Sequence, residues 1–358
     1  MELKLDISRT YAIALEGGGA KGGYEIGVWR ALEEAGVRYN AVSGTSVGAL
    51  NGALMAMRDL PRAEAAWNDM RLSKVVELDE EQEENLSRAF GGEIELDDAR
   101  ELIPEAWEII KNRGLDVAPL RAWVREVVDA GRVKSSDVEL FIATVSLTDR
   151  KALELKVNDL PENEICDMLL ASAYHPTFRL EKLGGKFYTD GGVVDTLPLH
   201  ALVTHGYKDI IAVRIPGMGH ERRFKIPEDV SVTYIAPEFD LGGVLNFDAQ
   251  KSRRDMTIGY LDAKRVLYGL AGRQYYIERT MSEREALSLL CDCKSWKGTL
   301  RDYIERELPR IARKLGCDGD YYALMLAVAE SAAVERDIDH LRIYTDREFL
   351  QLLSEADK

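Results

Sequence analysis

Ser46 lies at the centre of a short motif bounded by glycines, Gly44-Thr45-Ser46-Val47-Gly48. Between a strand and a helix, such a motif forms a turn so sharp that only small residues fit on either side of the central one. The turn exposes the serine hydroxyl at the N-terminus of the helix, which stabilises developing negative charge. A serine that only caps the helix would give the same five residues. The strand and helix predicted on either side favour a nucleophile.

A serine hydroxyl attacks a carbonyl only when a base takes its proton. The chain has five histidines, and surface or capping roles fit all of them, including His175, which precedes Pro176. Asp190 follows a predicted strand and precedes Gly191 and Gly192. A plain turn accounts for these three residues taken alone. Beside Ser46, however, a carboxylate with the ordinary aspartate pKa of about 4 is ionised at neutral pH and acts as general base.

A glycine-rich loop between the first predicted strand and the first predicted helix offers backbone N–H groups to a ligand. Glycines let these groups turn toward an anion or a developing oxyanion, and the helix N-terminus adds positive potential. The same loop fits the G-x-G-x-x-G pattern of dinucleotide-binding proteins. Its six residues are Gly17, Gly18, Gly19, Ala20, Lys21 and Gly22.

A dinucleotide-binding module needs an acidic residue near the end of the second strand to bind the ribose. Residues 40–44 contain no carboxylate, which counts against nicotinamide and flavin cofactors. A phosphate-binding Walker loop is excluded, because Lys21 is not followed by Ser or Thr and the spacing differs. We therefore expect no cofactor.

The elements around these motifs alternate between strand and helix. Residues 11–15 predict a buried strand, and a helix with helical apolar spacing follows and ends at Gly36. The second strand and the helix after Ser46 are expected at 39–43 and 47–57. Further strands are expected from β-branched and aromatic content at 140–147, 186–189, 210–215 and 230–236. This pattern is typical of α/β folds with a mainly parallel sheet.

In a parallel sheet the carboxyl ends of the strands collect at one edge. The glycine loop, Ser46 and Asp190 each follow a predicted strand. We therefore expect all three to meet around a single site at that edge.

The composition is that of a folded protein of ordinary polarity. The 358 residues are 46% hydrophobic and 30% charged, which is enough to bury a large core and excludes extensive disorder. The formal charge of -15 repels nucleic acid and strongly anionic membranes. A small apolar rim still permits transient contact with a neutral lipid surface.

Neither a metal site nor a membrane segment is expected. The four cysteines lack the spacing of a disulfide framework or a zinc site, and Cys291 and Cys293 are more simply half-buried residues at a helix end than metal ligands. The apolar run at 11–15 is shorter than the core of a signal peptide, and no stretch reaches the roughly 18 apolar residues of a membrane span. These features lead us to expect a cytoplasmic protein.

Taken in order, the glycine loop, the Ser46 motif and Asp190-Gly191-Gly192 resemble the patatin-like phospholipase family. The resemblance continues, as in bacterial members, through residues 140–144, 171–178, 246–248 and 259–263. It covers residues 10–267, over which it implies a patatin-like acyl hydrolase domain with a three-layer α/β/α sandwich.

The resemblance also implies a chemistry and a set of roles. The family hydrolyses acyl esters of phospholipids, glycolipids or acylglycerols through a Ser-Asp dyad without calcium. Ser46 would be the nucleophile, Asp190 the base, and the amides of mainly Gly18 and Gly19 the oxyanion hole. The same acyl-enzyme would also serve an acyltransferase that passes the acyl group to an alcohol or a lysolipid.

Two regions fall outside this resemblance. Residues 61–132 are polar and predicted to be helical, with an acidic run at 77–84 that we interpret as a solvated surface insertion, although its position also suits a lid. Residues 268–358 are expected to form a mainly helical extension, with helices at 299–315 and 321–334 and an edge strand at 341–345.

Overall fold

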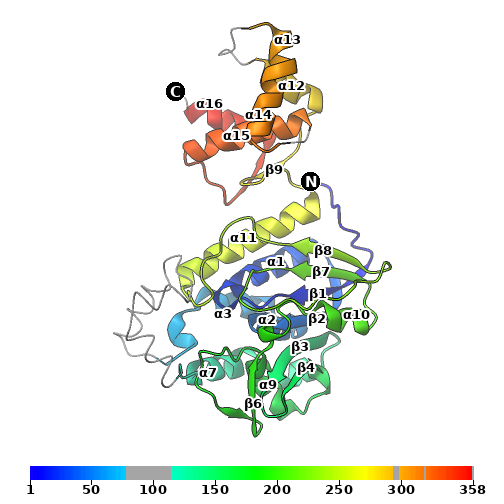
Figure 1. Cartoon of the computed structure of the whole chain (residues 1–358), viewed down its shortest axis with the longest axis vertical. Coiled ribbons are helices and arrows are strands. Elements are labelled where there is room, and N and C mark those ends of the chain that lie inside the picture. Colours follow the sequence, from blue (N-terminus) through cyan, green and yellow to red (C-terminus); the bar gives the residue numbers. More distant parts are fainter. Residues whose placement is uncertain (78–113, 293–297, 318–319, 357–358) are drawn as a thin grey trace. The chain divides into compact units, whose positions relative to one another are not determined.

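The computed structural model describes residues 1–77, 114–292, 298–317 and 320–356. They form two compact units, one of residues 6–263 and one that combines residues 1–5 with residues 264–358. Figure 1 labels their elements along the chain. The acidic run at 77–84 lies outside the described residues from position 78 onward, and so does Cys293.

An eight-stranded sheet forms the centre of the larger unit. Its order is β5-β6-β3-β2-β1-β7-β8, with β4 paired to β3 off this path. The strands from β3 to β8 in this order run parallel, whereas β4 and β6 are antiparallel to β3. The strands are β1 (Thr10–Leu15), β2 (Arg38–Thr45), β3 (Glu139–Ser146), β4 (Lys151–Lys156), β5 (Lys182–Leu183), β6 (Lys186–Asp190), β7 (Asp209–Val213) and β8 (Ser231–Ile235).

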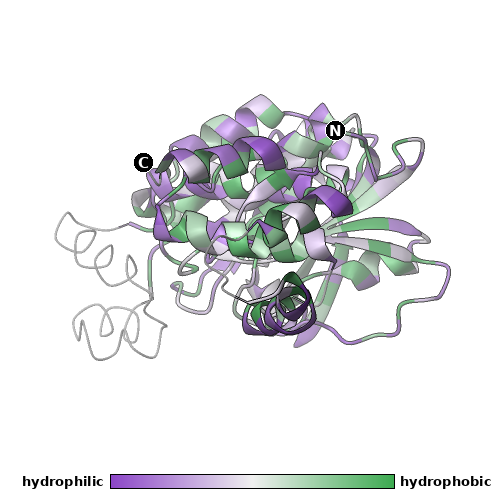
Figure 2. Cartoon of the chain, turned by 90° about the horizontal axis from the view of Figure 1, so that it is seen from above, coloured by the Kyte–Doolittle hydropathy of each residue, from purple (hydrophilic) through white to green (hydrophobic). Residues whose placement is uncertain are grey.

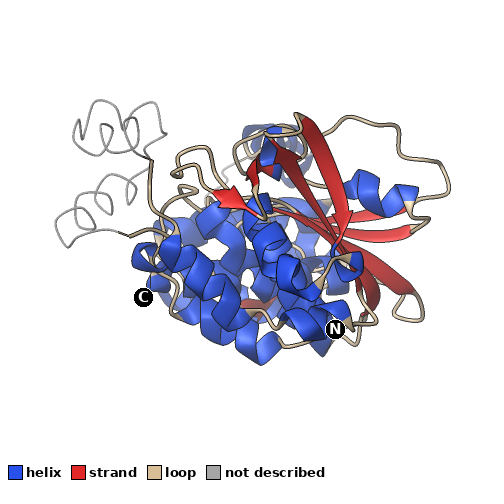
Figure 3. Ribbon diagram, turned by 90° about the horizontal axis from the view of Figure 1, so that it is seen from below, coloured by secondary structure: helices blue, strands red, loops and turns tan. Residues whose placement is uncertain are grey.

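Helices connect these strands, and Figure 3 shows them in blue around the red sheet. Several begin with a side-chain cap or with proline in the first turn, as α3 does at Asp59 and Pro61. The helices are α1 (Gly23–Glu34), α2 (Val47–Ala56), α3 (Leu60–Asn68), α7 (Ala118–Val127), α8 (Ala130–Lys134), α9 (Glu162–Ser172), α10 (Leu199–Thr204) and α11 (Ala249–Tyr268).

Strand β1 shows how helices cover both faces of the sheet. Ala12 and Ala14 belong to a buried cluster that includes Leu202 of α10. Leu15, which points the other way, lies next to Gly52 of α2. Both faces of the parallel strands are therefore buried under helices, which gives an α/β fold of three layers. Figure 2 shows hydrophobic and hydrophilic residues alternating along the helices, as expected where one side packs on a core.

The smaller unit is mainly helical and has its own core. Strand β9 (Tyr276–Glu278) pairs in parallel with β10 (Ile343–Thr345). Tyr275, Tyr322 and Phe349 lie at the centre of its hydrophobic cluster. Its helices are α12 (Glu283–Cys291), α13 (Leu300–Asp302), α14 (Leu308–Lys314), α15 (Tyr321–Glu335) and α16 (Asp346–Ala356), with a π-helical turn between α13 and α14.

The expected strands and the helix after Ser46 are present within a few residues of the predicted positions. Strands β4, β5 and β9 and helices α9, α11 and α16 were not predicted from the sequence. Strand β6 was expected to be parallel and instead runs antiparallel to β3, so that prediction was wrong.

Candidate active site

Ser46 lies in a strained turn between β2 and α2. Its backbone has φ 55 and ψ −125, a conformation that residues other than glycine rarely adopt. A side chain at Gly44 would collide with the carbonyl of Gly48, and a Cβ at Gly48 would lie 2.6 Å from the carbonyl oxygen of Leu15. The two glycines therefore allow the chain to fold back tightly, and the turn holds the Ser46 side chain at the start of α2.

Ser172, the last residue of α9, stabilises this turn by a hydrogen bond to its backbone. The backbone N–H of Ser46 donates a hydrogen bond to Ser172 Oγ over 3.0 Å. The Ser172 hydroxyl in turn donates to the carbonyl oxygen of Ala143 in β3 over 2.7 Å. Ser172 is fully buried. The sequence analysis gave this serine no role, because only the folded chain brings α9 against the turn.

Asp190 ends β6 and lies opposite Thr144 of the antiparallel strand β3. Its backbone N–H donates to the carbonyl oxygen of Tyr174 over 2.9 Å, and its Oδ1 accepts a hydrogen bond of 2.7 Å from the N–H of Gly192. The aspartate thus lies at the end of a strand that runs antiparallel to β2 in the same sheet. Convergence with Ser46 was expected, but the parallel arrangement from which it was argued was wrong.

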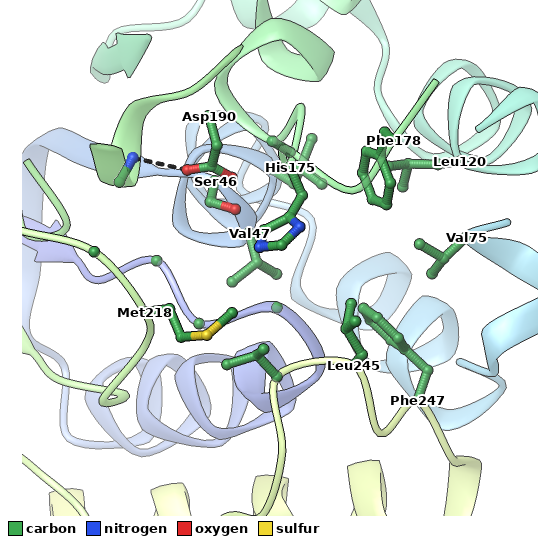
Figure 4. A pocket seen from close by; sticks show the side chains of 18 of the residues that line it. Ser46, Val47, Val75, Leu120, His175, Phe178, Asp190, Met218, Leu245 and Phe247 are labelled. Atoms are coloured by element: carbon green, nitrogen blue, oxygen red, sulfur yellow. Dashed lines mark hydrogen bonds between the residues drawn. The ribbon is translucent and has the colours of Figure 1, made fainter. Parts of the chain in front are cut away.

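Burial makes Asp190 more basic than an exposed aspartate. Loss of solvent raises its pKa to about 6, although hydrogen bonds with the Ser46 side chain and the Gly192 amide act to lower the pKa. Figure 4 shows Ser46 directly beside Asp190 at one end of the pocket. The carboxylate is therefore ionised at neutral pH and able to accept a proton from the serine.

The glycine loop passes the same end of the pocket. The N–H of Gly17 donates to Thr196 and that of Ala20 to Val244, over 2.9 and 2.8 Å. Between these anchors, the amides of Gly18 and Gly19 have no acceptor among the described residues. Gly19 has φ 57, which glycine adopts without strain. Two free N–H groups therefore lie near Ser46, as an oxyanion site requires.

An ion pair between buried Glu16 and partly exposed Arg214 lies where this loop begins. Glu16, which precedes Gly17, is almost fully buried and contacts Arg214 over 3.1 Å. Its other carboxylate oxygen accepts the N–H of Ile215 over 3.0 Å. The pairing joins the ends of β1 and β7, so the loop is attached to the sheet at a rigid point. Nothing in the local sequence around Glu16 indicated this role.

The pocket itself has a volume of about 250 Å³ and mostly apolar walls. Ser46, Asp190 and Gly17 to Gly19 form its polar end, and Figure 4 shows the side chains that line it. Such walls suit the hydrocarbon part of a ligand, because hydrocarbon buried against them leaves no polar group of the wall unpaired. The apolar lining includes Val47, Leu50, Trp67, Met70, Val75, Leu120, Trp123, Phe178, Leu245 and Phe247.

Only part of each predicted motif lines this pocket. Lys21 instead donates a hydrogen bond of 2.5 Å to the carbonyl of Pro216, and Gly22 packs against Trp67. Gly192 lines the pocket, whereas Gly191 does not. The predicted residues that lie behind the pocket wall are Ala20, Lys21, Gly22, Gly44, Thr45, Gly48 and Gly191.

His175 was expected at the surface or at a cap, and this was wrong. It lies in the turn after α9 and lines the pocket close to Ser46. Burial lowers the pKa of its imidazole to about 4. The ring is therefore neutral at neutral pH. The sequence analysis missed this residue because only the packing of α9 turns its side chain inward.

The described residues contain neither a candidate metal site nor a candidate membrane-spanning helix. No group of three or more His, Cys, Asp or Glu side chains there could hold a metal ion. None of the described helices combines the length and the apolar character needed to cross a membrane.

A sequence model of the patatin-like phospholipase family matches residues 13–203, just over half of the chain. The chain belongs to this family. The match includes the glycine loop, Ser46 and Asp190.

Related proteins match this chain over a short stretch. Lysophospholipase nte1 of Aspergillus terreus is 52% identical over 48 residues, or 13% of this chain and 3% of that protein. Patatin-like phospholipase domain-containing protein 6 of Homo sapiens is 57% identical over 47 residues, again 13% of this chain and 3% of that protein. The matches thus span a small part of these long relatives.

Two solved structures are also similar. VipD from Legionella pneumophila aligns with a TM-score of 0.40 and 16% identity over 92% of this chain and 81% of its own. The type III effector protein ExoU aligns with a TM-score of 0.38 and 13% identity over 92% of this chain and 79% of its own.

Proposed function

We propose that the protein is a lipid acyl hydrolase in which Ser46 is the nucleophile and Asp190 the base. The observation that supports this most directly is the pairing of a serine in a strained turn with a buried carboxylate in one apolar pocket. A serine that only capped α2 would need neither the strain nor the carboxylate, and the Ser46 side chain makes no capping hydrogen bond. We assign the hydrolase domain to residues 10–267 and regard residues 268–358 as an extension.

The proposed reaction begins with proton transfer from Ser46 Oγ to Asp190 as Oγ attacks the acyl carbonyl. The oxyanion that forms accepts hydrogen bonds from the amides of Gly18 and Gly19, and one such donor is typically worth about 3 kcal/mol. Asp190 then passes its proton to the departing alcohol. Water hydrolyses the acyl-enzyme with the same carboxylate as base.

The apolar walls of the pocket would bind the acyl chain during both steps. Leu50, Trp67 and Phe247 line the same pocket as Ser46 and carry no charge. Burying hydrocarbon there contributes roughly 25 cal/mol for each Å² removed from water. A fatty acyl ester is therefore a better substrate for this site than a short polar ester.

We also propose that the pocket meets its substrate at a lipid surface. Val193 and Met218 line the pocket, yet the two residues are 45% and 50% exposed. Two exposed apolar side chains at the opening permit shallow contact with neutral lipid, while the net charge of -15 disfavours anionic membranes.

Two substitutions test the proposed dyad. Ser46→Ala removes the nucleophile and Asp190→Asn the base, and each is expected to lower kcat for p-nitrophenyl octanoate by about 10³-fold or more. Asp195→Asn is the matched control, because Asp195 is also a buried aspartate but does not line the pocket. Circular dichroism checks that each variant is folded. Wild-type activity in Ser46→Ala or Asp190→Asn would remove that residue from the mechanism.

A further inference from the structure

Two polar side chains that the proposed mechanism does not use, those of His175 and Thr196, belong to residues that line the pocket. His175 lies beside Ser46 at the polar end of an otherwise apolar space. Its ring packs edge-on against Phe178, with the ring centres 5.9 Å apart. An imidazole held in this way either accepts or donates a hydrogen bond inside the pocket, depending on which nitrogen carries the proton.

Contacts with Thr177 decide which nitrogen that is. The backbone N–H of Thr177 donates to Nδ1 of His175 over 3.4 Å, and the Thr177 hydroxyl lies 2.9 Å from the same nitrogen. A backbone N–H can only donate, so Nδ1 is the acceptor, and a hydroxyl can donate to it as well. A neutral ring whose Nδ1 accepts carries its hydrogen on Nε2.

The imidazole is neutral because burial lowers its pKa to about 4. With a hydrogen on Nε2, it has no lone pair there to take a proton from Ser46, which leaves Asp190 as the base. No described residue accepts a hydrogen bond from Nε2. Nε2 is not among the fully buried unpaired atoms of the described residues, so it faces the open space of the pocket. A ligand that fills this space and excludes water has to supply an oxygen to this donor.

The proposed reaction shows where that oxygen must be. The carbonyl oxygen of the substrate is bound by Gly18 and Gly19, and the hydrocarbon chain has no acceptor. The ester oxygen that leaves receives a proton by way of Asp190. The remaining place is the alcohol part of the ester. The cavity of about 250 Å³ is small for a lipid ligand, so a second acyl chain beside the first is disfavoured.

We propose that His175 is a specificity-determining residue whose Nε2–H binds a free hydroxyl on the alcohol part of the substrate, next to the scissile ester. This inference rests on the proposed function. The substrate class is then a carboxylic ester with one acyl chain whose alcohol carries a second, unesterified oxygen.

Two esters of identical shape test the proposal. In 2-hydroxyethyl octanoate the alcohol ends in a hydroxyl, and in propyl octanoate a methyl group takes its place. Wild-type protein is expected to prefer the hydroxyl ester by roughly tenfold in kcat/KM. His175→Phe keeps an aromatic ring without a donor, so the ratio of its kcat/KM values on the two esters should fall to about one. His175→Gln restores a donor and should recover much of the preference.

The outcomes separate this inference from the function on which it rests. Equal losses on both esters in His175→Phe would show that the ring only packs the pocket and would overturn the proposal. So would a wild-type protein that treats the two esters alike, or a preference that survives in His175→Phe. Absence of any hydrolysis that depends on Ser46, measured with Ser46→Ala beside wild type, would instead overturn the proposed function itself.

Discussion

Ser172 accepts the backbone hydrogen bond of Ser46 over 3.0 Å and so ties the end of α9 to the most strained residue of the candidate site. Two residues further along, the carbonyl of Tyr174 accepts the backbone N–H of Asp190 over 2.9 Å. One short segment therefore holds the backbone of both members of the proposed dyad. Its geometry sets the separation of nucleophile and base, although it contributes no reacting atom.

Ser172→Ala tests whether this attachment matters. The variant leaves the buried N–H of Ser46 without an acceptor, which is expected to cost about 1–3 kcal/mol of stability. It also frees the strained turn to relax, so kcat should fall by about tenfold with little change in KM, because a displaced nucleophile affects the chemical step. Urea unfolding and steady-state hydrolysis of p-nitrophenyl octanoate measure the two effects.

Ser136→Ala is the matched control for this substitution. Ser136 also donates to a backbone carbonyl, that of Ala56 over 2.6 Å, and accepts a backbone N–H, that of Val138 over 3.0 Å. It does not line the pocket. Ser136→Ala should therefore lose stability and keep its kcat. A Ser172→Ala variant with wild-type kcat would mean that the turn holds its shape without α9.

The pH profile of hydrolysis should report the ionisation of Asp190. The base must be deprotonated, and burial raises its pKa to about 6. Below that pH, kcat/KM is expected to fall about tenfold for each pH unit. His175 adds no inflection near neutral pH, because its pKa is about 4.

Asp195 provides the control for that assignment, since burial raises its pKa to about 6 as well. Asp195→Asn should leave the inflection in place because Asp195 does not line the pocket. If Asp195→Asn abolishes the inflection, the titrating group is not Asp190.

Asp190→Asn should make the protein more stable at neutral pH while it removes activity. The pKa of Asp190 rises from 3.8 to about 6 on folding. Stability from a group with a raised pKa is fully present below the unfolded value and is lost as the pH rises through the folded value. The difference between these two pKa values corresponds to about 3 kcal/mol of stability that the wild-type protein lacks at neutral pH. Asparagine does not titrate, and its side-chain oxygen still accepts the Gly192 N–H.

Urea unfolding of both proteins at several pH values checks this expectation. The advantage of Asp190→Asn should be largest above about pH 7 and should disappear below about pH 3, where Asp190 is protonated in both the folded and the unfolded wild-type protein. An advantage that stays constant with pH would show that the carboxylate does not titrate with a raised pKa in the folded protein.

Local sequence patterns predicted the parts of the fold that local chemistry determines. Apolar runs such as residues 11–15 give buried strands, and the glycines around Ser46 require a tight turn. Strand β4 was missed, because half of its residues are charged and, among the described strands, it pairs only with β3. Its stability comes from pairing with β3, which a local pattern does not reveal.

The site was predictable in its reacting groups and unpredictable in its supports. The direction of β6 could not be derived, because a short strand ending in Asp190 has the same sequence pattern whether its partner strand is parallel or antiparallel. Glu16, Ser172 and His175 carry no distinctive local pattern. Their roles depend on contacts between residues distant in sequence. Glu16 pairs with the end of β7, Ser172 binds the turn at Ser46, and His175 lines the pocket.

Gly19→Ala tests the proposed oxyanion site. Gly19 has φ 57, and a Cβ there would collide with the carbonyl oxygen of Val244. The loop must therefore shift and take its free amides out of position, so kcat is expected to fall by about 10²-fold, the usual effect of losing one oxyanion donor. Gly36→Ala separates backbone strain from this loss, because Gly36 has φ 73 but nothing within 4 Å of the added Cβ. That control should lose about 1 kcal/mol of stability and keep its kcat. A Gly19→Ala variant that folds and retains wild-type kcat would place the oxyanion on donors other than this loop.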